Sequence, residues 1–307
     1  MILLRRDFLV LFSKEGVTVK RARATKRFLK LALTPLLIFT VVLVIPFLNG
    51  LYYTFTDWDG FEATKLVGFE NYKKSFQDPT FWSTLRFTAL FVVVSLVIVN
   101  VVAFGLALIV TSNLRSRNFL RTFFFVPNLI GGVVLGVIWQ FIFNSAIVAL
   151  AEKYNWELFK QSWLQDTNKA FWALIIVTVW QSSGYMMIVY ITGLISIEHD
   201  VLEASQIDGA SPLRTLLTIK IPLMAQAFTI ALFLTLRGGF MAYDVNVALT
   251  GGGPFRTTEL ISLHIFQDAF ANGNFGTGQS KAVVMFIIVA LAALVQVTIS
   301  KRYEVQR

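Results

Sequence analysis

The chain has 307 residues, of which 56% are hydrophobic and only 15% are charged. Soluble globular domains carry about 25% charged residues, so this composition excludes an ordinary soluble protein and indicates a chain that crosses a membrane several times. The absence of cysteine excludes structural disulfides and thiolate metal sites. The formal net charge is +9, but the basic residues collect at the ends of apolar segments, which argues against nucleic-acid binding.

Six apolar segments recur along the chain, each with about 20 residues, enough to cross a hydrocarbon core of about 30 Å. Lipid offers no partner to backbone polar groups, so these segments must be helices. The sequence therefore predicts an all-α, polytopic membrane protein with six transmembrane helices. The predicted spans are Leu31–Leu51, Phe87–Val110, Phe123–Phe143, Phe171–Leu194, Leu223–Tyr243 and Ala282–Ile299.

Lysine and arginine residues set the predicted orientation. They are concentrated in the first 30 residues, in the short second loop and in the tail, and such residues favour the cytoplasmic side. This predicts a basic cytoplasmic segment (1–30), a six-helix domain (31–300) and a cytoplasmic tail (301–307). The basic segment is a charged topology anchor or, alternatively, an interfacial helix that contacts anionic lipid.

Proline and glycine interrupt the third predicted span. Pro127 lacks a backbone donor and is expected to kink the helix. Gly131, Gly132 and Gly136 follow, and two of them share one face. Small residues allow close helix packing, and a gating hinge is the alternative interpretation.

Ionisable residues are rare inside the predicted spans, and Arg237 is the clearest case. It lies roughly 22 Å beyond Pro222 along a helix, past the midplane toward the outer face. Such a charge faces a water-filled path, or else it extends outward or pairs with Asp244. His264 is predicted to be a surface histidine on an outer segment rather than a metal ligand. No catalytic constellation, metal site or G-x-x-x-x-G-K-[ST] phosphate loop is present, so any ATP must be hydrolysed by another subunit.

The loop of residues 198–222 joins the fourth and fifth spans. Its composition predicts a short helix from Asp200 to Ile207, ended by Gly209 in the left-handed conformation. Ser211 and Pro212 then fit the cap and first position of a second helix that ends near 219, and Pro222 marks the start of the fifth span. Two short helices cannot bury their apolar faces alone, so they need the membrane interface, another protein or the chain's own loops as a partner.

The same loop resembles the EAA loop of ABC importer permeases: Glu-Ala-Ala, three residues, Gly, nine residues, then Ile-x-Leu-Pro. Every spacing is kept, and Ser205 and Ile221 are the departures. Residues 66–91 (LVGFENYKKSFQDPTFWSTLRFTALF) and 249–270 (LTGGGPFRTTELISLHIFQDAF) resemble carbohydrate permeases of the type of the maltose permease's larger partner. The residues that the resemblance assigns to ATPase coupling are Glu203, Ala204, Ser205, Asp208, Gly209, Ile219 and Pro222.

The resemblance implies a type I ABC importer permease fold in the cell membrane, in contact with membrane lipid. It implies one half of a heterodimeric pore, formed with a second permease subunit. Two cytoplasmic ATPase subunits would bind ATP and Mg, while this chain binds no cofactor and is not itself an enzyme. An extracytoplasmic substrate-binding protein would deliver an oligosaccharide, and ATP-driven closure would reverse the pore.

Alignment through the loop also assigns the family's sugar-contacting positions. They fall at Ser182, Tyr185, Gly238, Gly239 and Ala242. Maltose-type members carry an aromatic residue and amides at the last three, so this chain predicts either a wider cavity for a bulkier glycan or a subunit that contacts substrate little. Arg237 beside these positions would alternatively suit an anionic ligand such as a uronate-containing oligosaccharide.

Three other classes compete with the sugar importer. An ion-coupled secondary transporter would need acidic residues inside the spans, and the apolar cores contain none. A structural membrane protein without a pore would not need an ATPase-docking loop. Glycerol-3-phosphate-type permeases share much of the pattern, so the choice between sugar and sugar phosphate stays open.

Overall fold

The computed structural model describes residues 28–29, 31–112 and 114–304. Over these residues the chain is built from helices, with one isolated antiparallel bridge between Thr56 and Leu66. This confirms the all-α prediction. Most of the basic segment (1–27) and the end of the tail (305–307) lie outside the described residues, so the interpretations of the basic segment stay predictions.

Five helical stretches are long and apolar enough to cross a membrane. They cover Leu31–Tyr53, Pro79–Thr111, Gly132–Tyr154, Thr167–Ile195 and Phe275–Lys301. A sixth arises if Pro212–Leu223 and Ala225–Phe240, which meet at an angle of 71°, count as one broken span. The predicted number of six spans is therefore confirmed if the bent pair is counted as one span. Of the predicted fifth span, residues 225–240 form one helix.

The third span differs from its prediction. α5 (Arg117–Phe125) ends in a 3-10 turn at Val126–Leu129 that contains Pro127, and the chain is extended at Ile130. A new helix then begins at Gly132 and continues as α6 (Gly132–Phe141), a π-helical stretch (Ile142–Ala146) and α7 (Ile147–Tyr154). Pro127 therefore breaks the helix instead of kinking it, because its missing N–H and fixed φ end the preceding helix.

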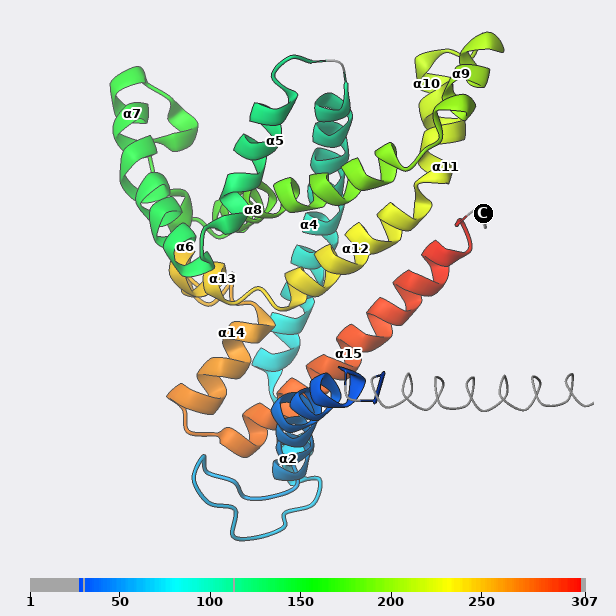
Figure 1. Cartoon of the computed structure of the whole chain (residues 1–307). Helices are drawn as coiled ribbons and strands as arrows, with labels where there is room; N and C mark the ends of the chain where they lie inside the picture. The colour runs from blue at the N-terminus through cyan, green and yellow to red at the C-terminus, as the bar shows by residue number, and fades with distance from the viewer. Residues whose placement is uncertain (1–27, 30, 113, 305–307) are drawn as a thin grey trace, which may run out of the picture.

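The body of the molecule consists of α4 (Pro79–Thr111), α8 (Thr167–Ile195), α12 (Ala225–Phe240) and α15 (Phe275–Lys301), as Figure 1 shows. α4 packs along both α8 and α12, and α12 packs along α15. A buried polar bridge joins three of them. The Tyr190 hydroxyl donates to Asn100 (2.7 Å), and the Asn100 amide donates to Thr235 (3.2 Å). These buried polar groups are thus satisfied across helices and fix their register.

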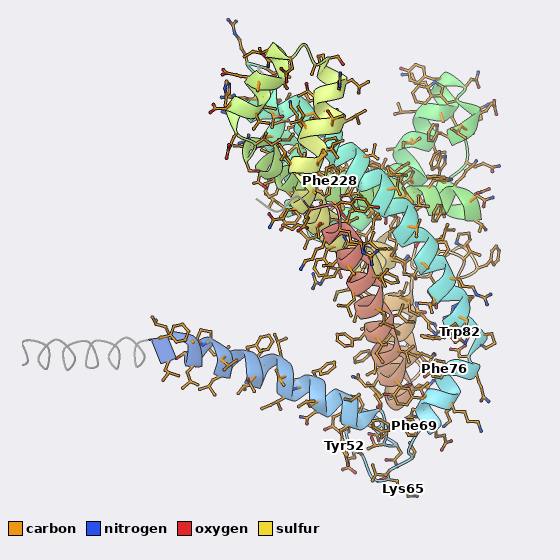
Figure 2. All side chains as sticks on the ribbon, turned by 90° about the vertical axis from the view of Figure 1, so that its right-hand side faces the viewer. Tyr52, Lys65, Phe69, Phe76, Trp82 and Phe228 are labelled. Carbon is orange, nitrogen blue, oxygen red and sulfur yellow. The ribbon has the colours of Figure 1, made fainter. Side chains whose placement is uncertain are left out.

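The first span stands apart from the body. It includes a π-helical stretch (Thr40–Val44) and α2 (Ile45–Tyr53). Figure 2 shows that this span extends away from the rest of the chain, from Tyr52 toward the N-terminus. The C-terminal part of the first span packs against α15, where the Phe47 and Phe286 rings are 5.3 Å apart. None of its most apolar 18-residue window is buried inside this chain, so its apolar surface faces lipid or another subunit.

Short helices cap the two ends of the body. At one end lie α9 (His199–Ile207), α10 (Pro212–Thr215), a π-helical stretch (Leu216–Lys220) and α11 (Ile221–Leu223), on the same side as the C-terminal end of α15 (Figure 1). The opposite end holds the loop of residues 54–69, α3 (Glu70–Gln77), and α14 (Ile261–Phe266) with its π-helical continuation (Gln267–Ala271). α13 (Asp244–Leu249) lies between α12 and α14 and packs against α6.

Candidate functional site

α9 ends in a Schellman motif at Gly209. The Gly209 N–H donates to the Gln206 carbonyl, and the Ala210 N–H donates to the Ser205 carbonyl, both at 3.0 Å. Gly209 has φ +69°, which glycine adopts without steric cost. The predicted left-handed glycine is confirmed, and it sets the angle between α9 and the next helix.

The second helix begins as predicted and ends later than predicted. The Ser211 hydroxyl accepts from the Arg214 N–H at 3.3 Å, and Pro212 holds the first helical position. The helix does not end near 219; it continues through a π-helical turn and α11 to Leu223, and the chain bends at Met224. Pro222 removes one donor from this ladder, and the bend follows it by two residues. We call residues 198–223 the coupling loop, after the role that the sequence resemblance implies for it.

Most of the residues assigned to coupling lie on the surface of this loop. Glu203, Ala204, Asp208 and Gly209 are exposed, whereas Ile219 and Pro222 are half-buried. Ser205 is buried, and its hydroxyl donates to the Leu202 carbonyl at 2.7 Å. That bond shows why serine replaces the usual alanine here without an unpaired buried group.

The coupling loop also exposes apolar side chains. Ile207 is 86% exposed, and Leu213 and Leu217 are exposed as well. Among the described residues, the Glu203 carboxylate meets one ionisable partner, the His199 ring at 3.1 Å. His199, Asp200 and Glu203 also hold potential metal-ligand atoms within 4.8 Å of one another, but all three are exposed. This combination of exposed apolar and acidic groups is typical of a surface that a second protein covers.

Four of the predicted substrate-pathway residues line one cavity of about 360 Å³, namely Ser182, Gly238, Gly239 and Ala242. Hydroxyl and amide side chains supply most of its polar lining, together with one carboxylate: Ser95, Asn128, Thr178, Gln181, Thr235, Tyr243 and Asp244. Over the part of the chain that the structure describes, no lysine or arginine lines it. Tyr185 and Arg237 do not line this cavity, and both are exposed.

The two glycines of the cavity wall have different surroundings. A Cβ on Gly238 would meet no heavy atom within 4 Å, whereas a Cβ on Gly239 would lie 3.0 Å from Val92. Gly238 therefore leaves open space, and Gly239 allows α12 to approach α4. The alternative pairing of Arg237 with Asp244 is not observed, since no carboxylate of the described chain lies within 4.0 Å of the guanidinium.

The glycines of the third span pack against α13. A Cβ on Gly132 would lie 2.6 Å from the Asp244 Cβ, and one on Gly136 would lie 2.5 Å from the Ala248 Cβ. At both positions a larger residue would force α6 and α13 apart. The structure thus shows the close packing that the sequence suggested for this face, and Gly131 has open space around it.

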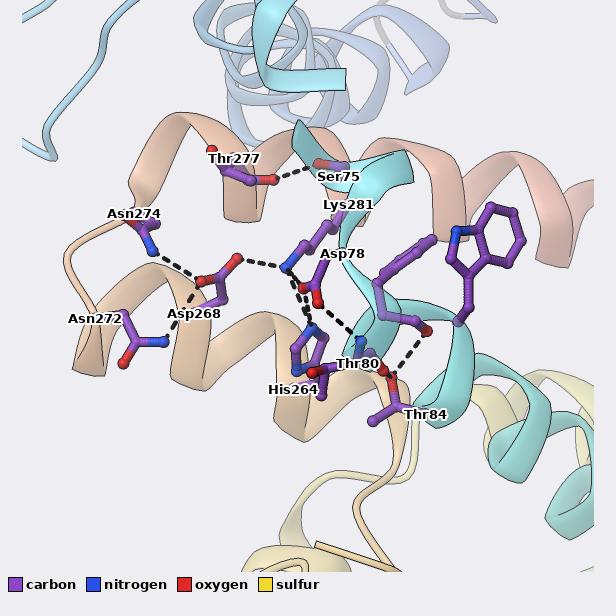
Figure 3. A network of polar contacts seen from close by, with 12 residues as sticks. Ser75, Asp78, Thr80, Thr84, His264, Asp268, Asn272, Asn274, Thr277 and Lys281 are labelled. Carbon is purple, nitrogen blue, oxygen red and sulfur yellow. Dashed lines mark hydrogen bonds and ion pairs between the residues drawn. The ribbon is translucent and has the colours of Figure 1, made fainter. Parts of the chain in front are cut away.

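His264 is buried, which corrects its prediction as a surface residue. It is 4% exposed, with Nε2 3.3 Å from the Asp78 carboxylate and Nδ1 3.4 Å from the Glu259 carboxylate. The Lys281 ammonium lies beside it and donates to Asp78 and Asp268, at 2.6 Å each (Figure 3). We call Asp78, Arg256, Glu259, His264, Asp268 and Lys281 the outer network, because the sequence predicts that this end faces the outer side of the membrane.

Arg256 closes the outer network on its other side. Its guanidinium donates to both oxygens of Glu259, at 2.6 and 2.8 Å. Arg256 has φ +63° and Phe255 has φ +52°, so this part of the loop takes a left-handed conformation that non-glycine residues rarely adopt. The bidentate pair compensates for that backbone cost.

The carboxylates of the outer network stay ionised despite their burial. Burial disfavours the charged form of Asp78, but hydrogen bonds from Lys281 and the Thr80 N–H outweigh it and lower the pKa to about 2. Burial of Glu259 is likewise outweighed by hydrogen bonds from His264 and Arg256, which lower its pKa. The pKa of Asp268 is lowered because Lys281 and Asn274 overcome its desolvation.

Sequence reasoning missed most of this network. Lys281 and Asp78 are 203 residues apart, so nothing local in the chain pairs them. The one available signal was Asp78 before Pro79, a helix cap, and Asp78 does accept from the Thr80 N–H at 2.8 Å. A lysine directly before the predicted sixth span looked like an ordinary flanking charge.

Comparison with known proteins identifies the family. The family described as binding-protein-dependent transport system inner membrane component matches residues 100–305. The chain belongs to this family of ABC importer permeases. It is 43% identical over 273 residues to the probable starch degradation products transport system permease protein AmyD of Thermoanaerobacterium thermosulfurigenes, covering 88% of this chain and 92% of that relative.

Two further likenesses support the assignment. The chain is 29% identical over 274 residues to the multiple sugar-binding transport system permease protein MsmF of Streptococcus mutans, covering 89% and 94% of the two chains. Among solved structures, a bacterial ABC transporter involved in the import of the acidic polysaccharide alginate matches with a TM-score of 0.79 and 18% identity, over 94% of this chain and 99% of that one. This likeness shows the type I importer permease fold.

Proposed function

We propose that this chain is the pore-forming permease subunit of an ATP-driven oligosaccharide importer. It pairs with a second permease subunit, couples to two cytoplasmic ATPase subunits that bind ATP and Mg, and receives sugar from an extracytoplasmic binding protein. The similarity to relatives named for starch degradation products and multiple sugars supports this substrate class. The basic residues at both chain ends support a cytoplasmic position for the termini and the coupling loop.

The observation that carries the proposal is the connection between the coupling loop and the cavity. The loop presents Glu203, Ile207 and Leu213 to solvent and joins α12 at the 71° bend. α12 then supplies Gly238 and Gly239 to the cavity wall. A displacement of the docked loop is therefore transmitted along a rigid helix to the substrate path, as alternating access requires.

The cavity favours a neutral sugar over an anionic one. Hydroxyl and amide side chains can donate to and accept from sugar hydroxyl groups. Asp244 is the charged residue in the lining, and a carboxylate there would repel a uronate or phosphate. Arg237 does not line the cavity, so it offers no compensating charge at this position.

The coupling role is tested with Glu203→Lys in the transporter assembled with its partner subunits. Because Glu203 is exposed and is proposed to meet a basic residue of the ATPase, charge reversal should place two cations next to each other at the interface between the loop and the ATPase. We expect loss of ATP hydrolysis stimulated by the sugar-loaded binding protein, while assembly of the two permease subunits continues. ATPase assays and co-purification measure the two outcomes.

A matched control is Glu62→Lys in the loop of residues 54–69, which reverses another exposed acid far from the coupling loop. It should keep stimulated ATP hydrolysis. Equal stimulation in the Glu203→Lys and Glu62→Lys complexes would refute the coupling role. Failure of every neutral oligosaccharide to stimulate the wild-type complex would refute the proposed substrate class.

A further inference from the structure

A chain of aromatic rings runs from Tyr53, at the end of α2, to Tyr243, between α12 and α13. Neighbouring ring centroids are 4.7 Å apart for Tyr53 and Trp58 and 5.5 Å for Trp58 and Phe275. The series continues at 5.4 Å to Phe270, 4.8 Å to Phe266 and 5.1 Å to Tyr243. We call these six residues the aromatic track. They come from three separate segments of the sequence, so the fold assembles the track.

The aromatic track borders a second cavity of about 390 Å³. Five of its six rings line this cavity: Trp58, Tyr243, Phe266, Phe270 and Phe275. Its few polar groups include Gln279 and Ser262, whose hydroxyl donates to the Ala242 carbonyl at 2.6 Å. An apolar, aromatic lining with few oriented polar groups is typical of a small-molecule site.

The two cavities share part of their lining. Met241 and Tyr243 line both the second cavity and the cavity that contains Gly238 and Gly239. The aromatic track therefore ends at the wall of the substrate path. In the orientation proposed above, Trp58 and the segment before α15 lie on the outer side, so the track leads from the outer surface inward.

Several rings of the track are open to contact. Phe270 is 64% exposed and Phe266 is 43% exposed, and their rings are stacked at 30° to one another. In a membrane protein, exposed apolar surface of this kind meets a ligand, another protein or lipid. The C–H-rich faces of glucose rings suit aromatic faces, while the sugar hydroxyl groups remain hydrated around the rim.

We propose that the aromatic track is a stacking surface on which the glucose rings of an α-glucan oligosaccharide pass from the outer surface to the central cavity. This inference rests on the proposed function. It supplies the aromatic contact that the resemblance implied at Gly238, Gly239 and Ala242 and that these small residues cannot make. Longer glucans cover more rings at once, so they should depend on the track more than short ones.

The experiment compares Phe270→Leu with Phe270→Tyr in proteoliposomes that contain the complete transporter, with maltoheptaose and maltose as probes. Leucine keeps apolar surface but has no ring face, whereas tyrosine keeps the ring and adds a hydroxyl group. We expect Phe270→Leu to lower kcat/KM for maltoheptaose uptake about tenfold and for maltose uptake less, and Phe270→Tyr to stay within about twofold of wild type.

The control is Phe286→Leu, an exposed ring of α15 that packs on Phe47 and does not belong to the track. It should transport both sugars as wild type does. If Phe270→Leu transports maltoheptaose as well as Phe270→Tyr or better, the surface serves lipid or subunit packing and the inference is overturned alone. If the wild-type complex takes up neither sugar while it remains assembled, the α-glucan inference is overturned, whereas the proposed function fails only if no neutral oligosaccharide stimulates ATP hydrolysis.

Discussion

Lys281 in the outer network is 2% exposed and donates to two carboxylates, whereas Glu203 in the coupling loop is exposed and meets only His199 among the described ionisable residues. The outer network joins the start of α4, the segments around α14 and the start of α15, so its partners all come from this chain. The coupling loop has fewer partners within the chain and presents apolar and acidic groups outward.

This contrast separates two kinds of polar design. Buried charges are tolerated only when they are paired and hydrogen-bonded, so the outer network is complete within the permease and holds its outer end together. An exposed acid beside exposed isoleucine and leucine contributes little to the stability of the isolated chain, and its role depends on what docks there. Variants of the outer network should therefore change stability, and variants of the loop should change coupling.

The largest expected effect follows from Lys281→Met. Methionine keeps the apolar volume but leaves the half-buried Asp78 and the buried Asp268 without their cation. Removing one partner of a buried ion pair costs about 3–5 kcal/mol. We expect a much lower unfolding temperature of the detergent-solubilised protein, measured by tryptophan fluorescence, and a smaller folded fraction in size-exclusion chromatography.

The matched control is Lys74→Met, which breaks an exposed pair with Glu70 on α3. Exposed pairs contribute about 0–1 kcal/mol, so this variant should unfold close to wild type. Similar unfolding temperatures for the Lys281 and Lys74 variants would mean that the outer network does not stabilise this end, and the contrast between the two ends would fail.

Acid should weaken the same network by a smaller amount. The pKa of Asp78 falls from 3.8 to about 2 in the folded state, so its contribution is fully present above pH 4 and is lost as the pH drops toward 2. This amounts to about 2 kcal/mol. Unfolding temperatures measured between pH 5 and pH 2 should fall over that window, and Lys281→Met should lose most of this dependence. An identical pH profile in that variant would contradict the assignment to Asp78.

The number of spans and the coupling loop could be predicted because their signals are local. A run of about 20 apolar residues specifies a membrane helix by itself. Gly209, Ser211 and Pro212 specify a turn and a cap through backbone preferences that need no distant partner, and the structure confirms each. Of the five positions that alignment through the loop assigned to sugar contact, four line one cavity.

The errors arose where distant contacts or broken helices decide the structure. The FFFV run before Pro127 looked like membrane helix, but it belongs to α5 and a corner that packs on α8, where a Cβ on Gly184 would lie 1.9 Å from the Phe124 carbonyl oxygen. His264 looked like a surface residue because Asp78 is far away in sequence and no sequence pattern places Glu259 against the ring. Neither outcome is encoded in a periodicity or a short motif.

The smallest effect on stability, with a large effect on coupling, is expected from Gly209→Pro. Proline cannot adopt φ +69° and cannot donate to the Gln206 carbonyl, so it should disrupt the turn and change the angle between α9 and α10. The loop surrounds Gly209 with open space, and the global unfolding free energy should change by only about 1 kcal/mol. ATP hydrolysis stimulated by the loaded binding protein should nevertheless be lost.

Gly209→Asn should keep most of this stimulation, because asparagine tolerates the left-handed region and retains the N–H donor. Equal loss in both variants would show that the turn conformation is not what couples this loop to the ATPase.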